Sequence, residues 1–325
     1  MTSLRACRRR RLALLLVLAV MVAACSSDGD EAPAPSGDDL SVQVASFDLA
    51  VGRVSRFLVG VVTTDQELIG YGSPELRFSF AGTGTGSVPS KPGPPVRAAY
   101  LPVPGTALVT PAPAEPRLAK GSERGVYAAE TDFDRAGFWQ VELTARIDGK
   151  ERKGTGAFAV SEKHIVPAPG DPAIAIENLT LSSADAPKAG IDSRAGGGAE
   201  VPDPSLHSTT VAAALAAGRP AVVVFSTPVY CQSRFCGPVT DVVEELAGVY
   251  GDRASFVHIE IWRDFQGKVI NKAAAEWLLR DGDLNEPWVY VVGADGRITA
   301  RFDNVVNRFE LEPLLRDLPV IGPAS

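Results

Sequence analysis

Two cysteines, Cys231 and Cys236, are the residues of this sequence best suited to chemistry. They lie in the stretch AVVVFSTPVYCQSRFCGPVTDVV, residues 221–243. Cysteine thiols exchange disulfides, form fixed disulfides or bind soft metal ions. A disulfide needs Cα atoms within roughly 7 Å, which two residues five apart on a regular helix do not meet. If the two cysteines pair, the segment between them must therefore be a non-helical loop.

The elements that must position this pair are a strand before it and a helix after it. Residues 222–225 form a β-branched, wholly apolar run, typical of a strand buried on both faces. Pro238 suits the first turn of a helix. Apolar residues continue at helical spacing at Val239, Val242, Val243, Leu246 and Val249. Cys236 would lie at the positive end of this helix with Arg234 close by, and both effects favour a reactive thiolate.

The beginning of the chain predicts export. The first 24 residues hold five arginines and no acid, followed by an apolar run too short for a membrane span. The run ends Val-Ala-Ala-Cys25, which resembles the lipobox of bacterial lipoproteins. In that family cleavage leaves the cysteine as a lipid-modified N-terminus, here Cys25, so the resemblance implies a palmitate-type anchor on the extracytoplasmic face of the cell membrane. An ordinary secretory signal peptide is the alternative.

Charge and composition limit the partners of the mature chain. Five of the 32 basic residues belong to the predicted signal, which leaves 27 against 39 acidic residues, a net charge near −12. This charge argues against nucleic acid as a partner. Residues 25–39 are acidic and rich in proline and serine, which is typical of a solvated tether.

Residues 40–160 predict an all-β domain. Trp139, Val141, Leu143, Ala145 and Ile147 alternate one residue in two, and Asp148-Gly149 then marks a hairpin. We expect an antiparallel, immunoglobulin-like β-sandwich. The stretch GVYAAETDFDRAGFWQVELTARIDG resembles the late strands of small bacterial extracytoplasmic sandwich domains. Residues 81–123 are rich in Gly, Pro and Ser and predict a long excursion or an irregular edge.

Residues 161–168 read as a linker, and residues 169–320 predict an α/β domain. Strands are expected at 221–226, 255–262, 288–292 and 297–302, and helices at 209–217, from Pro238 onward, at 271–280 and at 307–318. The order is a parallel strand-helix-strand unit followed by a hairpin and a last helix.

Residues 165–320 resemble the thioredoxin-like superfamily. The resemblance rests on GRPAVVVFS, on Cys236-Gly237-Pro238, on Pro287 at the start of a strand and on VYVVGADGRITARFDNVVNRFELEPLL. It implies that Pro287 is cis and faces the cysteines, that Cys231 is the exposed attacking thiol and that Cys236 is the buried resolving thiol. Tyr230 precedes the first cysteine.

The sequence departs from the thioredoxin pattern at four places. The cysteines are spaced CxxxxC rather than CxxC, and Val224 replaces a buried acid. Tyr230 replaces the tryptophan before the first cysteine, and Glu286 precedes the proline where a small or β-branched residue is usual.

Three functions are open for the cysteine pair. We expect thiol-disulfide exchange with exported protein thiols or a partner oxidoreductase, catalysed by Cys231 and Cys236 with support from Arg234, Tyr230 and Pro287. A non-catalytic binding or assembly module with a structural disulfide is the main alternative, although a six-residue loop contributes only about 2 kcal/mol. Copper delivery is the third, but two sulfurs alone make a poor metal site. We therefore predict no metal or other cofactor.

The remaining side chains with chemical potential have plain structural interpretations. His258 alternates with apolar residues and reads as a strand histidine, while His164 and His207 are expected in linkers. Tyr230 and Phe235 flank the cysteines, and they either form an apolar docking surface or bury the loop.

Overall fold

The computed structural model describes residues 39–84, 86 and 88–321. The predicted signal peptide, the lipid attachment site Cys25 and nearly all of the predicted tether lie outside these residues. Among the helices that are described, none is both long and apolar enough to span a membrane.

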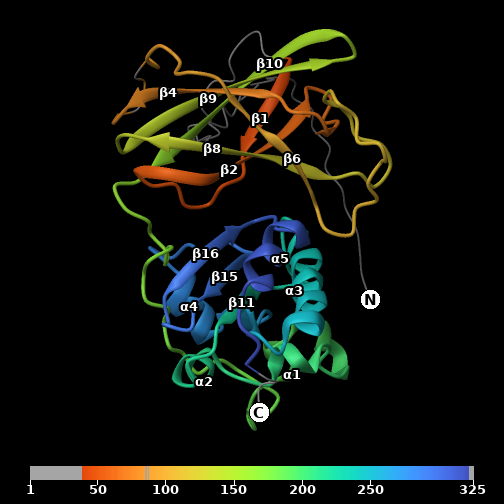
Figure 1. Ribbon diagram of the computed structural model, residues 1–325, viewed down its shortest axis with the longest axis vertical. Helices are drawn as coiled ribbons and strands as arrows, with labels where there is room; N and C mark the ends of the chain where they lie inside the picture. Colours follow the sequence, from red (N-terminus) through yellow and green to blue (C-terminus); the bar gives the residue numbers. More distant parts are fainter. Residues whose placement is uncertain (1–38, 85, 87, 322–325) are drawn as a thin grey trace, which may run out of the picture. The chain divides into compact units, whose positions relative to one another are not determined.

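Most of residues 40–160 form one eight-stranded sheet with the order β5-β4-β9-β10-β1-β2-β8-β6 (Figure 1). Its strands are β1 (Leu40–Val44), β2 (Gly52–Thr63), β4 (Glu75–Gly82), β5 (Val96–Arg97), β6 (Ala99–Pro102), β8 (Gly125–Phe133), β9 (Gly137–Ile147) and β10 (Lys150–Val160). The short strands β3 (Ile69–Gly70) and β7 (Arg117–Leu118) pair separately. The all-β prediction for this region is confirmed.

This sheet curls around one core instead of splitting into two hydrogen-bonded layers. Register shifts interrupt the β2–β8 ladder between Val54 and Phe57 and the β4–β9 ladder between Phe80 and Gly82, and such irregularities bend strands. The pairing is antiparallel except that β1 joins β10 in parallel. The eight strands therefore form one continuous sheet, which buries one face in a large core around Phe57 and part of the other face in a smaller cluster around Leu58 and Leu101.

Strand β9 shows how the sequence builds that face. The five alternating residues from Trp139 to Ile147 are all buried, as their spacing predicts. Asp148 and Gly149 both have positive φ, 50° and 75°, which is the backbone that a two-residue hairpin turn requires. The turn thereby fixes the register of β9 against β10, with Ile147 opposite Lys150.

The remaining chain forms a four-stranded sheet with the order β12-β11-β15-β16 and helices on both faces (Figure 1). The strands are β11 (Ala221–Ser226), β12 (Ser255–Glu260), β15 (Trp288–Val292) and β16 (Ile298–Asp303). The helices are α1 (Lys188–Ile191), η1 (Ser193–Gly198), η2 (Pro204–His207), α2 (Val211–Ala216), α3 (Cys236–Tyr250), α4 (Lys272–Leu278) and α5 (Arg308–Arg316). A small hairpin, β13 (Trp262–Asp264) and β14 (Val269–Ile270), follows β12.

Strand β11 lies inside this sheet and is buried along its whole length. It pairs in parallel with β12 and antiparallel with β15, so the predicted order of elements is confirmed. Val223 and Phe225 pack on the side of α2 and α4, whereas Val222 and Val224 pack on the side of α3 and α5. The sheet therefore holds the end of β11, and the loop after it, between two apolar layers.

Candidate functional site

The cysteine loop leaves the end of β11 and runs into α3. Residues 227–235 are turn and bend, and α3 begins at Cys236. Cys231 and Cys236 form a disulfide with their Cα atoms 6.0 Å apart. The expectation that a paired CxxxxC needs a non-helical loop is confirmed.

The two sulfurs have different surroundings. Cys236 is fully buried, while Cys231 is partly exposed. The backbone N–H of Cys236 donates to Cys231 Sγ at 3.3 Å, and the Ser233 hydroxyl lies 3.3 Å from the same sulfur. Hydrogen bonds to a charged form favour that form. After reduction, the thiolate is therefore best stabilised on Cys231, at the positive end of α3.

Glu286 is a site residue that the sequence did not single out as functional. One of its carboxylate oxygens lies within 4.8 Å of the sulfurs of Cys231 and Cys236. Burial, together with the nearby carboxyls of Glu260 and Asp283, raises the pKa of Glu286 to about 7. A proton donor and acceptor for neutral pH thus lies beside the disulfide.

Pro287 follows Glu286 and begins the entry into β15. The Glu286–Pro287 peptide is cis, as the thioredoxin-like resemblance implies. Strand β15 pairs directly with β11, Trp288 opposite Phe225. This pairing brings the segment before β15 to the end of β11, where the cysteine loop begins.

The other residues predicted near the cysteines lie either on the surface or packed against neighbouring side chains. Arg234 is exposed and has a left-handed backbone, φ 63°. Tyr230 stacks on Phe265 of the β13–β14 hairpin, with ring centroids 3.8 Å apart and planes 2° from parallel. Phe235 instead packs against a buried cluster that includes Leu101. Phe235 therefore buries the loop, whereas Tyr230 contributes to an apolar surface with the partly exposed Phe265.

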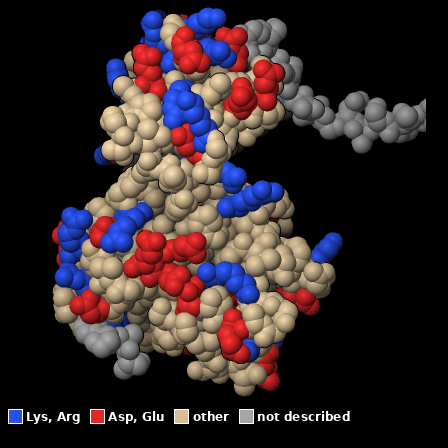
Figure 2. All heavy atoms as spheres, turned by 90° about the vertical axis from the view of Figure 1, so that its right-hand side faces the viewer, with Lys and Arg blue, Asp and Glu red and all other residues tan. Residues whose placement is uncertain are grey.

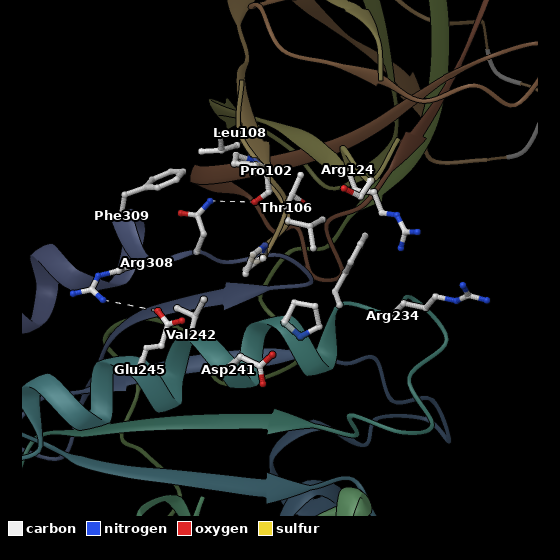
Figure 3. A pocket seen from close by; sticks show the side chains of 17 residues that line it. Pro102, Thr106, Leu108, Arg124, Arg234, Asp241, Val242, Glu245, Arg308 and Phe309 are labelled. Carbon is white, nitrogen blue, oxygen red and sulfur yellow. Dashed lines mark hydrogen bonds and ion pairs between the residues drawn. The ribbon is translucent and has the colours of Figure 1, made fainter. Parts of the chain in front are cut away.

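A cavity of about 610 Å³ lies next to the first turn of α3 (Figure 3). Its lining comes from residues 102–108 and 122–124, from α3 and from the start of α5. Arg234 and Phe235 belong to this lining, but the cysteines do not. In Figure 3 the guanidinium of Arg234 points outward, away from Arg308 and Phe309 on the opposite side. The cavity thus lies beside the cysteine loop, and the disulfide does not line it.

The surface around α3 is acidic. Asp241 and Glu245 on this helix have side chains that are 61% and 64% exposed. On the face drawn in Figure 2, one group of acidic side chains lies in the middle of the molecule, and further acidic side chains are interspersed with basic ones over the rest of the face. This distribution agrees with the negative net charge of the chain.

A buried polar chain continues from the disulfide into the core. The Thr240 hydroxyl donates to the carbonyl of Cys236 at 2.8 Å, and Ser226 Oγ lies 2.7 Å from Thr240 Oγ1. His258 Nε2 lies 2.9 Å from Ser226 Oγ. The polar residues at the end of β11 and on α3 thereby connect the first turn of α3 with β12.

Two histidines and an aspartate lie together at the end of this row of polar contacts that is farthest from the disulfide. Asp192 Oδ2 is 3.3 Å from His258 Nδ1 and 3.5 Å from His207 Nε2. The expectation that His207 lies in a linker is wrong, because its side chain is fully buried in η2. Burial lowers the pKa of His207, which keeps the imidazole neutral at physiological pH. A polar, glycine-rich sequence gave no periodic signal for this burial.

Comparisons with known proteins gave no match from which the roles of these residues could be inferred. No protein family model, no curated protein and no solved structure matches the chain.

Proposed function

We propose that the chain exchanges thiols and disulfides through Cys231 and Cys236. The observation that carries this proposal is the difference between the two sulfurs, with a carboxyl group beside both. Cys231 is partly exposed and accepts hydrogen bonds, Cys236 is buried, and Glu286 lies within 4.8 Å of the two sulfurs. A disulfide with no role beyond stability needs none of these features.

The exchange proceeds through a mixed disulfide with a partner of the exported dithiol or disulfide class. In the reducing direction, the Cys231 thiolate attacks a partner disulfide, and one partner sulfur leaves as a thiolate that takes a proton from the Glu286 carboxyl. The Glu286 carboxylate then accepts the proton of Cys236, whose sulfur attacks Cys231 Sγ and expels the second partner sulfur. Two electrons and the Cys236 proton, relayed through Glu286, pass to the partner, and the Cys231–Cys236 bond forms. The second partner sulfur leaves as a thiolate that takes its proton from water. The reverse sequence oxidises a partner dithiol.

The arrangement around the cysteines supports a thioredoxin-like assignment for residues 169–320. A central strand leads into the cysteine loop, helices cover both faces of the sheet, and a cis proline precedes β15. In this setting Glu286 takes the place of the buried acid whose position is filled by Val224. For residues 40–160 we propose an immunoglobulin-like arrangement in which the curled sheet folds over on itself, since Phe57 of β2 meets Phe78 of β4 across the core with ring centroids 4.9 Å apart.

The reduction potential of the cysteine pair tests the function directly. It is measured by equilibrating the protein with glutathione or dithiothreitol buffers and trapping the thiols. We expect a value between roughly −120 and −270 mV, the range of known exchange proteins. A value below about −300 mV, with loss of folding on reduction, would instead identify a stapled binding or assembly module.

We further propose that the protein is held on the extracytoplasmic face of the cell membrane by a lipid on Cys25. The arginine-rich start, the apolar run and the Val-Ala-Ala-Cys sequence support this. In cells, Cys25→Ser should move the protein from the membrane fraction to the soluble fraction and abolish labelling with palmitate. Unchanged membrane retention of the variant would contradict the anchor.

A further inference from the structure

The buried Asp192, His207 and His258 come from three separate segments. Asp192 lies between α1 and η1, His207 ends η2, and His258 lies in β12. The side chains of all three are inaccessible to solvent. One donor atom from each lies within 4.8 Å of the others. A set of two imidazoles and one carboxylate, converging in the core, requires an explanation.

Hydrogen-bond direction shows which nitrogen of His258 carries its proton. A carbonyl only accepts, so the Thr240 hydrogen goes to the Cys236 carbonyl. Ser226 must then donate to Thr240, which leaves Ser226 Oγ to accept from His258 Nε2. The Ser226 carbonyl, 3.3 Å from Nε2, also only accepts. Neutral His258 therefore carries its proton on Nε2 and turns the Nδ1 lone pair toward Asp192.

His207 adds further donor atoms without hydrogen-bond partners. Both of its ring nitrogens, and Nδ1 of His258, are buried and lack a hydrogen bond within the described part of the chain. Buried polar atoms in proteins are almost always paired, and an ion is one of the usual reasons when they are not. A lone pair that faces a carboxylate is repelled unless a cation lies between the two groups.

The separations between the donor atoms fit a bound ion. In a tetrahedral zinc site with bonds of about 2.0–2.1 Å, neighbouring ligand atoms lie about 3.3 Å apart. Asp192 Oδ2 is 3.3 Å from His258 Nδ1 and 3.5 Å from His207 Nε2. The Nε2–H bond of His258 to Ser226 is also the kind of outer contact that orients a metal-binding imidazole.

Local charge leaves room for a cation despite the neighbouring Arg194. Its guanidinium contacts Asp192 at 2.8 Å, but it also pairs with Asp203 and lies 3.6 Å from Asp241. Three carboxylates thus share one guanidinium, and the surplus charge is negative. Arg194 donates to both oxygens of Asp192, which fixes the carboxylate in place.

We propose that Asp192, His207 and His258 bind a divalent transition-metal ion of the zinc class. Two neutral imidazole nitrogens and one carboxylate oxygen are the ligand set that such ions accept. Because the site is closed to solvent, the ion enters during folding. It would fasten the polar segment 181–207 to β12. Ser193, next to Asp192, accepts the backbone N–H of Val229 at 3.1 Å, so the ion would also steady the cysteine loop.

Cobalt uptake during refolding tests the site. The purified oxidised protein is unfolded in denaturant that contains a chelator, and the chelator is then removed. The protein is refolded with Co²⁺, and unbound metal is removed by gel filtration. We expect one equivalent of Co²⁺, visible ligand-field absorption without a thiolate-to-cobalt band, and a higher Tm than the chelated protein. His258→Gln should lose the bound cobalt, whereas His164→Gln, which changes the remaining histidine, should retain it.

A Cys231→Ser, Cys236→Ser variant separates this site from the redox proposal. It should bind cobalt as the parent does, because neither sulfur is a ligand of the ion. Should His258→Gln fail to fold, the cobalt content and Tm of the refolded parent still decide the matter. A parent that takes up no cobalt, or takes it up with a thiolate band that the double variant lacks, overturns the proposal.

Discussion

At the scale of single residues, Glu286 and the Cys231 sulfur define the proposed chemistry. The carboxyl is partly buried beside the disulfide, and burial together with Glu260 and Asp283 raises its pKa to about 7. The hydrogen bond from the Cys236 N–H selects Cys231 as the thiolate. In the proposed exchange, the proton acceptor and the nucleophile therefore come from different segments of the chain.

The raised pKa of Glu286 predicts a dependence of stability on pH. The folded protein retains the proton up to about pH 7, whereas in the unfolded chain the carboxyl has its ordinary pKa of 4.5 and releases the proton there. Between these values the folded state binds more protons, so the free energy of unfolding falls as pH rises. Glu286→Gln removes this fall. We expect the variant to gain roughly 2 kcal/mol over the parent at pH 8, discounted for partial solvent screening, and almost nothing at pH 4.

Urea unfolding of the oxidised protein at the two pH values measures this difference, since no free thiol then titrates. Glu177→Gln, a change at an exposed glutamate, is the matched control and should shift the two free energies equally. An equal gain for Glu286→Gln at both pH values would show that its carboxyl titrates normally. The same variant should slow thiol exchange at neutral pH, because the proton acceptor is removed.

At the scale of elements, local patterns predicted the strands and helices but not the contacts that complete the site. The apolar run of β11, the proline in the first turn of α3 and the alternation in β9 each follow from short-range periodicity. Glu286 meets the cysteines only because β15 pairs with β11, more than 50 positions away in the sequence. In the sequence, Glu286 was only a departure from the thioredoxin pattern before Pro287. In the fold, its carboxylate lies beside the two sulfurs.

Two further regions show the limits of pattern reading. Residues 81–123 lack regular alternation, yet β5, β6 and β7 form there. Strands β5 and β6 pair with the longer strands β4 and β8, and β7 pairs with the equally short β3. The segment around Asp192 and His207 is polar and glycine-rich, and its burial depends on contacts with β12 and α3. In both cases tertiary pairing supplies the order that the local sequence does not encode.

The polar chain between β11, β12 and α3 makes a testable contribution to stability. Thr240 is fully buried and contacts both the Cys236 carbonyl and Ser226. Thr240→Val keeps the shape but leaves Ser226 without this partner, which should lower the free energy of unfolding by about 1–3 kcal/mol. Thr240→Ser keeps the hydroxyl and should restore most of the loss. Denaturant unfolding measures both variants. A valine variant as stable as the parent, with a loss only in the serine variant, would mean that the methyl group matters and the hydroxyl does not.

At the scale of the whole molecule, ion pairs connect the curled sheet with the α/β sheet. Arg56 of β2 donates from Nε to Glu310 at 2.9 Å and pairs with Asp303 at 3.2 Å. It also donates to the Val305 carbonyl. Asp48, in the loop after β1, pairs with Arg301 of β16 at 2.8 Å. Strand β16 and helix α5, at the end of the chain, are therefore bound by side chains from residues 40–160.

Arg56 is the best residue at which to test how strongly these ion pairs between the two sheets stabilise the fold. Its side chain is only 13% exposed, and burial already raises the pKa of Asp303. Arg56→Met keeps an aliphatic chain but leaves two carboxylates without their cation, so we expect a loss of about 3 kcal/mol at pH 8. Arg53→Met, on the same strand, removes an exposed pair with Glu130 and should change the stability far less.

The pH dependence of the Arg56→Met loss identifies its cause. An unpaired, buried carboxyl avoids its charge by binding a proton, so the penalty should shrink as the pH falls from 8 toward 4. Denaturant unfolding of the parent and both variants across this range measures the trend. A loss that stays constant with pH would assign the effect to the cation–π contact between the guanidinium and Phe302, whose ring centroid lies 5.2 Å from the guanidinium carbon. In that case charge pairing would not be what holds the two sheets together.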